Sequence, residues 1–388
     1  MASGVRTLEL AKSLNKLGIE TIVFSPYEET HTTKDGVRVV KVPTIFSALH
    51  IERSIYNTSR RFYYSHGLQR LVIKSSKRLL GGQFQLSNGL VNFFKKFDLD
   101  IVQAEQDNAA LTLLPIRSKL GIPLVLDLHG IWPEELLAAN AIKVDGSDWR
   151  DLHDLMRRIL NSVDLTVCLS KAMHDYVALN YGVDVRRTVV VPPGGRVFND
   201  EYIERSSPPK VVYAGMVSYR KHVDLFVNSM GLVKAARSDA EFYITKKGDL
   251  LKKMQDLALK LALDPNFFWF KDSDSTLKFL SSCHVGVHPS TNDVSARLSM
   301  PSKLFDYLSV GLPVVANDVG GWTDIVKENR VGRITSDDPN EFAQAIIDLL
   351  DSPQEIAEYG NRAMRLIRTK YNWDISANIL KDQYKRLI

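Results

Sequence analysis

The chain has 388 residues, 45% of them hydrophobic and 24% charged, which excludes disordered and collagen-like classes and favours two domains. Its two cysteines, Cys168 and Cys283, lie in apolar stretches, which excludes a disulfide scaffold and indicates a reducing, cytoplasmic compartment. No apolar run approaches the roughly 20 residues that cross a bilayer, and we expect no signal peptide. The 50 basic residues barely outnumber the 45 acidic ones, and no basic face with stacking aromatics indicates nucleic-acid binding.

The first half of the chain alternates helical and strand-like patterns. Residues 8–17 predict an amphipathic helix that ends at Gly18, with Ser3-Gly4 as the end of a preceding loop. A helix that packs on a sheet usually follows a strand, and none precedes this one, so we expect either that the sequence as given starts late or that the first sheet lacks an edge or central strand. Apolar strands are predicted at 21–24, 37–42, 101–104, 123–128, 165–169 and 189–191, and helices at 111–120 and 149–160.

A domain boundary is predicted where the periodicity stops, at the segment that begins with Pro192 and is rich in Pro, Gly, Ser and charge. The alternation then restarts, which predicts two doubly wound α/β domains with ligands bound at the carboxyl ends of their strands, in a cleft between the domains. The second domain has predicted strands at 211–214, 242–245, 267–270, 285–288, 313–316 and 332–334, and closing helices at 340–350, 353–370 and 376–387.

Glycines and cations follow two strand ends of the second domain. A strand ends at Ala214, Gly215 lets the backbone turn, and Arg220 and Lys221 come just before a helix, where cations beside a positive helix N-terminus suit a diphosphate. The alternative is a solvated loop with ordinary surface cations. Gly320 and Gly321 open a later helix, where two glycines can bring backbone amides close to an anion or make a plain turn.

A third motif of the second domain begins at Pro301, which suits the first turn of a helix that ends before Gly311. The amides of Ser302 and Lys303 are candidates for holding phosphate oxygens, and Asp306 lies one turn later, where a carboxylate accepts from sugar hydroxyls. The alternative is a surface ion pair of Lys303 with Asp306, worth well under about 1 kcal/mol.

In the first domain, His129 follows a buried strand and lies at the edge of the sheet where ligands bind. A single histidine is as often structural as functional. No acidic group competes as a metal site, because Asp98 with Asp100 and Asp272 with Asp274 are interpreted as surface acids. We therefore expect no metal.

In this order and spacing, the motifs resemble the retaining glycosyltransferases of family 4, which have the GT-B fold of two Rossmann-like domains, and the resemblance covers nearly the whole chain. It is carried by Gly215 with Arg220 and Lys221, by Asp306 ahead of Gly311 and Pro313, by the segments 192–196 and 320–326, and by His129.

The resemblance implies an acceptor-binding domain at 1–195, a donor-binding domain at 196–365, and a C-terminal helix at 366–388 that returns to the first domain. It implies retaining transfer from a nucleotide-diphosphate sugar to a hydroxyl acceptor, without a cofactor or metal. The implied catalytic residues are His129, Lys221 and Arg220. The implied donor-binding residues are Gly215, Ser302, Lys303, Asp306, Gly320 and Gly321, and the acceptor-side residues are Gly4, Arg6 and His129.

Two residues depart from the family pattern. Leu298 stands where a glutamate contacts the transferred sugar, and Met216 replaces the first arginine of the donor clamp. Two alternatives therefore stay open: a nucleotide-sugar epimerase of the same fold and a non-catalytic nucleotide-sugar-binding protein. A phosphorylase lacks support, since no lysine has a pyridoxal phosphate context.

Residues 53–80 suggest where the acceptor is presented. Seven lysines and arginines and no acidic residue are interleaved there with apolar side chains, a pattern typical of a helix on an anionic membrane surface. The alternative is a helix packed on the first sheet with a solvated basic rim. Because the family often modifies lipid-carried acceptors, the resemblance favours a lipid-linked acceptor or a cell-surface glycan precursor and peripheral binding to the inner face of the cell membrane.

Overall fold

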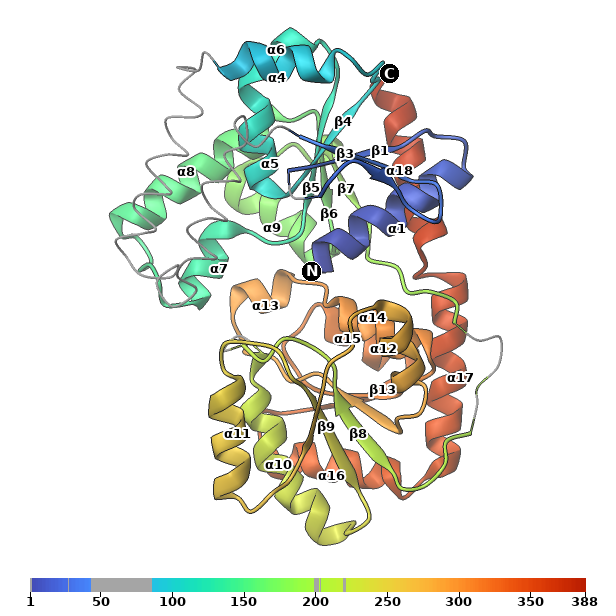
Figure 1. Ribbon diagram of the computed structural model, residues 1–388. Coiled ribbons are helices and arrows are strands. Elements are labelled where there is room, and N and C mark those ends of the chain that lie inside the picture. The colour runs from blue at the N-terminus through green and yellow to red at the C-terminus, as the bar shows by residue number, and fades with distance from the viewer. Residues whose placement is uncertain (1, 27, 43–85, 199–201, 203, 219–220) are drawn as a thin grey trace. The chain divides into compact units, whose positions relative to one another are not determined.

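The structure, a computed structural model, describes residues 2–26, 28–42, 86–198, 202, 204–218 and 221–388 (Figure 1). The chain forms two compact units: Met1–Pro192 together with Trp373–Ile388, and Pro193–Asn372. The predicted basic segment 53–80 and the predicted clamp residue Arg220 lie outside the described residues. Within the described residues, no helix is long and apolar enough to cross a membrane.

The first unit contains two sheets, whereas the alternation of its elements predicted one. Within the described residues of this unit, no backbone hydrogen bonds pair the strands β1 and β4, so β1 is an edge strand of one sheet and β4 is an edge strand of the other. The small sheet has the order β1 (Ile22–Ser25), β3 (Arg38–Lys41) and β2 (His31–Thr32), with β2 antiparallel and not predicted. The parallel sheet has the order β4 (Val102–Glu105), β5 (Leu124–Leu128), β6 (Leu165–Cys168) and β7 (Thr188–Val190).

Two predicted helix boundaries of the first unit were wrong. Gly4 does not end a loop, because it lies in the first turn of α1 (Ala2–Lys16). The helix predicted at 111–120 begins earlier and is interrupted by a 3₁₀ turn at Leu114–Ile116, since Pro115 has no backbone N–H to donate. The other helices of this part are α4 (Leu86–Phe94), α5 (Gln106–Leu113), α6 (Arg117–Leu120), α7 (Trp132–Ala138), α8 (Ser147–Ser162) and α9 (Lys171–Tyr181).

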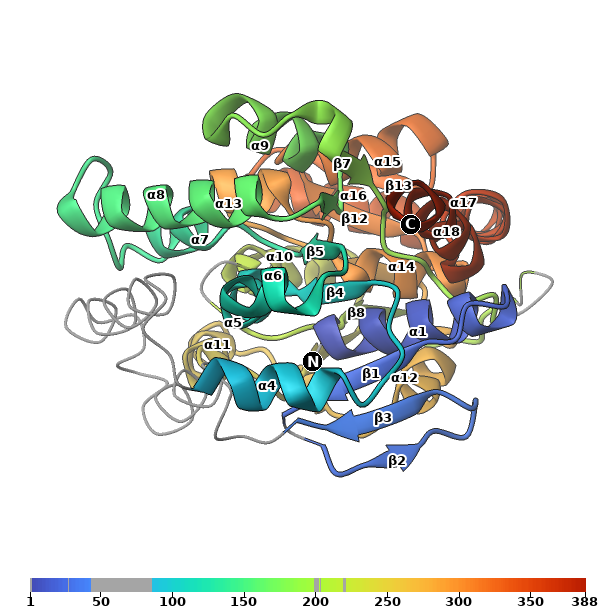
Figure 2. The same cartoon turned by 90° about the horizontal axis from the view of Figure 1, so that it is seen from above.

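Aromatic packing fixes the small sheet on a helix. The ring of Phe24 in β1 meets those of Phe93, Phe94 and Phe97 edge-on, with centroids 5.0–5.9 Å apart. Figure 2 shows the C-terminal half of α4 beside β1. Edge-to-face aromatic pairs add to the free energy gained by apolar burial, so this contact anchors the strand.

The C-terminal helix α18 (Trp373–Leu387) belongs to the first unit and lies beside α1 (Figure 1). Its buried face meets the apolar face of α1, which places Leu380 in one core cluster with Leu10 and Leu14. Two polar contacts fix the register: Ser13 donates to Asp374 at 2.6 Å, and Ser376 donates to the carbonyl of Pro192 at 2.8 Å.

The second unit is a doubly wound α/β domain with one six-stranded parallel sheet, in the order β10–β9–β8–β11–β12–β13. Successive strand residues face opposite sides, so Val211 joins the core under α10 and α16 while Val212 joins the core under α12 and α14. The strands are β8 (Lys210–Tyr213), β9 (Glu241–Thr245), β10 (Asn266–Phe268), β11 (Val285–Val287), β12 (Val314–Asn317) and β13 (Gly332–Thr335). The helices are α10 (Val223–Ala236), α11 (Leu251–Lys260), α12 (Ser273–Leu280), α13 (Val294–Leu298), α14 (Ser302–Ser309), α15 (Trp322–Asn329), α16 (Pro339–Leu350) and α17 (Pro353–Thr369).

Candidate functional site

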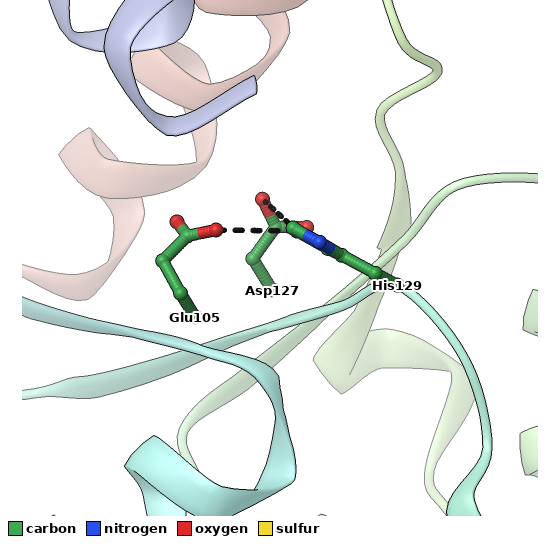
Figure 3. A group of neighbouring side chains, drawn as sticks. All are labelled: Glu105, Asp127 and His129. Atoms are coloured by element: carbon green, nitrogen blue, oxygen red, sulfur yellow. Dashed lines mark ion pairs between the residues drawn. The ribbon is translucent and has the colours of Figure 1, made fainter. Parts of the chain in front are cut away.

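In the first unit, His129 belongs to a cluster of charged residues at the carboxyl ends of β4 and β5. Its Nε2 lies 3.2 Å from the carboxylate of Glu105 and 3.5 Å from that of Asp127 (Figure 3). Register explains the grouping, because Glu105 pairs with Asp127 across the parallel ladder. The sequence analysis singled out His129 but missed both carboxylates, although Glu105 directly follows the predicted strand 101–104 and Asp127 lies near the end of the predicted strand 123–128.

Arg6 completes this cluster from α1. Its guanidinium makes two hydrogen bonds to the Asp127 carboxylate, at 2.8 and 3.1 Å, and others to the carbonyls of Val191 and Pro192. Arg6 is 4% exposed, so its donors are directed at the protein interior. We therefore interpret Arg6 as a positioning residue for Asp127, whereas the resemblance implied an acceptor-side contact.

The charges of the cluster determine its protonation. Burial alone lowers the pKa of His129, but Asp127 and Glu105 outweigh burial and raise it to about 9. Burial raises the pKa of Asp127, whereas Arg6 and His129 lower it to about 2. At neutral pH, His129 is therefore an imidazolium between two carboxylates, which can donate a hydrogen bond but cannot take up a proton.

Glu105, Asp127 and His129 also have the spacing of a metal site, with ligand atoms within 4.8 Å of one another. A histidine ligand must be neutral, however, and here the neighbouring carboxylates stabilise the charged form. Arg6 already binds both oxygens of Asp127. We interpret the group as an ion-pair cluster.

In the second unit, the predicted donor residues Gly215 and Lys303 meet at the carboxyl end of β8. The Lys303 side chain lies across the ring of Tyr213, with Nζ 4.0 Å from the ring centroid. A side chain on Gly215 would collide with the end of Lys303. Gly215 was predicted to let the backbone turn, but the structure shows that its missing side chain makes room for a lysine.

Buried hydrogen bonds hold this strand end in place. The hydroxyl of Tyr307 in α14 accepts from the amide of Ala214 at 2.8 Å and lies 3.1 Å from the carbonyl of Val287. The amide of Gly215 donates to the Thr245 hydroxyl at 3.0 Å. The ends of β8, β9 and β11 are thus tied to one another and to α14.

Lys221 and His288 form a group of basic side chains with Lys303. Burial lowers the pKa of His288 and the pKa of Lys303 well below their ordinary values, and the charge of Lys221 lowers both further. The Nδ1 of His288 and the Nζ of Lys303 have no hydrogen-bond partner among the described residues. Sequence reasoning missed His288 as a site residue, although it is the last residue of the predicted strand 285–288.

Asp306 lies one helical turn after Lys303 and is half-buried. Desolvation raises the pKa of its carboxyl to about 6, although Arg196 and Lys303 act in the opposite direction. The predicted alternative of a surface ion pair does not apply, because Lys303 is 8% exposed.

The predicted glycine pair opens α15, where Gly320 and Gly321 both have positive φ, of 74° and 61°. The amide of Gly320 donates to Asp318 at 3.1 Å, so one of the two amides has a partner within the chain. Ser302 is exposed at the first turn of α14. Gly4 lies in the first unit on the exposed side of α1, where nothing in the structure requires a glycine.

Comparison with known proteins identifies the class. A family model described as Glycosyltransferase Family 4 matches residues 3–194, and one described as Glycosyl transferases group 1 matches residues 208–352. The D-inositol 3-phosphate glycosyltransferase 2 of Catenulispora acidiphila is 35% identical, over 70% of this chain and 67% of that protein. The chain belongs to glycosyltransferase family 4, as the motifs predicted, and it is a glycosyltransferase.

Solved structures show the same fold. Sucrose-phosphate synthase from Thermosynechococcus elongatus is similar with a TM-score of 0.72 and 15% identity, over 98% of this chain and 92% of that chain. Anabaena HepE in complex with UDP-glucose is similar with a TM-score of 0.63 and 17% identity, over 79% of this chain and 84% of that chain. The fold is GT-B, which confirms the predicted fold class.

Proposed function

We propose that this glycosyltransferase moves a sugar from a nucleotide-diphosphate sugar to a hydroxyl acceptor, with retention of the anomeric configuration and without a metal. The observation that carries the donor class is the group of basic side chains, Lys221, Lys303 and His288, at the carboxyl edge of the second sheet. The UDP-glucose bound to the structurally similar Anabaena protein supports the same class.

The chemistry follows from charge. Breaking the bond between sugar and diphosphate builds negative charge on the leaving group, and preorganised cations in a water-poor site stabilise that charge. Lys221 and the predicted partner Arg220 supply this charge in place of a metal. Asp306 accepts hydrogen bonds from the ribose hydroxyls, and it does so best above its pKa of about 6, where it is ionised.

The first unit is proposed to take the acceptor. Because His129 is protonated at neutral pH, it orients the acceptor or the transferred sugar and is not the catalytic base. The relative from Catenulispora bears the name of an inositol phosphate glycosyltransferase, which supports a polyol hydroxyl as the attacking group.

A thermal-shift panel of nucleotide sugars tests the donor class. A ligand present at 100 times its dissociation constant adds about 2.7 kcal/mol of stability. We expect one nucleotide to stabilise the protein, and Asp306→Ala to weaken its binding by about 1–3 kcal/mol. Stabilisation followed by interconversion of two nucleotide sugars without acceptor would identify an epimerase, and no stabilisation by any nucleotide would contradict the proposal.

The membrane-facing part of the proposal rests on the sequence of residues 53–80, whose seven cations each add about 1 kcal/mol near an anionic surface. We expect flotation with anionic vesicles at low salt and weaker flotation as salt is added. A variant with four of these cations changed to serine should stay at the bottom of the gradient. If neither the wild type nor this variant floats, the proposal of a lipid-linked acceptor at a membrane surface is contradicted.

A further inference from the structure

The ammonium of Lys303 is the most unusual buried group of the second unit. Lys303 is 8% exposed, and its Nζ has no hydrogen-bond partner among the described residues. Lysine is almost never buried without a partner, because removing its charge from water costs several kcal/mol. Something beyond the protein contacts must compensate this cost.

The ring of Tyr213 compensates only part of it. Nζ lies 4.0 Å from the ring centroid, and a cation–π contact offsets less than the full cost of desolvating an ammonium. Nearby charges oppose the ammonium further, since Lys221 lowers the pKa of Lys303 while Asp306 raises it. Among the described residues, Lys303 therefore has no hydrogen-bonded anion, and Asp306 offsets only part of the cost of its burial.

The chain also makes room for this side chain. The end of Lys303 fills the space that a side chain on Gly215 would need, at the end of the strand that precedes Lys221. His288 directly follows β11, the neighbour of β8, and feels the charges of both lysines. The ammonium, the imidazole and Lys221 thus converge from three segments on one edge of the sheet.

We propose that the Lys303 side chain, and not only the amides of α14, binds the phosphate oxygens of the donor diphosphate, in a place that Gly215 keeps open. This inference rests on the proposed function, because it assigns the ligand of the same site. Since burial lowers the pKa of Lys303, an arriving diphosphate stabilises its charged form, and binding should take up a proton.

Calorimetry with inorganic pyrophosphate and with uridine and guanosine diphosphates tests the inference. Titrations at pH 8 in two buffers of different ionisation enthalpy measure the protons taken up. We expect uptake by the wild type, loss of that uptake in Lys303→Met, and an affinity about 10- to 100-fold lower, as for a lost charged hydrogen bond. Lys234→Met, which removes an exposed lysine of α10, is the matched control and should bind like the wild type.

Gly215→Ala gives a second test, because it should displace Lys303 and weaken pyrophosphate binding without removing any charge. If the variants do not fold, the two-buffer titration of the wild type decides alone, and binding without proton uptake overturns the inference. A folded Lys303→Met with unchanged affinity also overturns it. If pyrophosphate binds with proton uptake but neither nucleoside diphosphate binds, the Lys303 site stands and the two nucleotides tested are contradicted as donors. If none of the three ligands binds, both the Lys303 site and the proposed function are contradicted.

Discussion

At the scale of single residues, the first unit depends on a buried carboxylate. Asp127 is fully buried, and its charge is balanced by Arg6 from α1 and by His129 from the end of its own strand. Breaking one partner of a buried pair leaves the other charge without compensation, whereas removing both is far less costly. Arg6 therefore stabilises the fold only while Asp127 carries its charge.

Arg6→Met should lower the free energy of unfolding by about 3–5 kcal/mol, because it removes the guanidinium that donates two hydrogen bonds to the buried Asp127 carboxylate and leaves only His129 to balance its charge. Adding Asp127→Asn should restore part of that loss. Arg362→Met is the control: Arg362 pairs with Glu358 at an exposed position, and its loss should cost under about 1 kcal/mol. Urea unfolding of these three variants measures the changes, and a double variant less stable than Arg6→Met alone would contradict the assignment.

The raised pKa of His129 makes its contribution depend on pH. A group whose pKa is higher in the folded state stabilises fully below its ordinary pKa of 6.5, and this stabilisation is lost as the pH rises through about 9. The free energy of unfolding of the wild type should therefore exceed that of His129→Gln by on the order of 1–3 kcal/mol at pH 6, and this difference should vanish by pH 10. Urea unfolding across this range is the measurement, and a gap that widens with pH would refute the ion-pair cluster.

At the scale of elements, the positions of the strands were easier to predict than the pairing between strands. Continuous apolar runs such as 123–128 and 285–288 place β5 and β11 to within a residue or two, because buried parallel strands leave little ambiguity. The strand pairing was not predictable, since the separation of β1 from β4 depends on contacts far apart in the sequence. β2, with two exposed residues, has no apolar pattern to detect.

Element geometry also explains what the motifs could not show about the site. Spacing placed Lys303 and Asp306 on one helix, but the pattern of a polar helix turn does not reveal that Lys303 is buried under Gly215. Similarly, the pairing of β4 with β5 is what brings Glu105 to His129. Motif residues were therefore predictable, whereas their partners on neighbouring elements were not.

The contact of α18 with α1 gives a prediction at this scale. Leu380 is fully buried in the cluster that joins the two helices, so Leu380→Ala should lower the stability of the first unit by about 2–5 kcal/mol. Leu179→Ala, at a position 85% exposed, should change it by less than about 0.5 kcal/mol. Hydrogen exchange resolved by segment should show faster exchange in α1 for Leu380→Ala, and unchanged protection there would contradict the packing role.

At the scale of the whole molecule, the charges of the two units match their proposed roles. The first presents a neutralised cluster in which each charge has a partner, and the second presents cations with few acids near them. An anionic donor is attracted to the second kind of site and gains little at the first. The charge distribution thus supports donor binding by Pro193–Asn372.

The most direct measurement is a proton NMR time course with the nucleotide sugar that stabilises the protein best, using water as the acceptor, run once with a chelator and once without it. The account predicts slow release of the nucleoside diphosphate and a free sugar that first appears in the anomeric configuration of the donor. Lys221→Ala should slow the release by about 10²–10³-fold, because it removes a charge directed at the leaving group. A sugar released with inverted configuration, or release that the chelator abolishes, would contradict metal-independent retaining transfer.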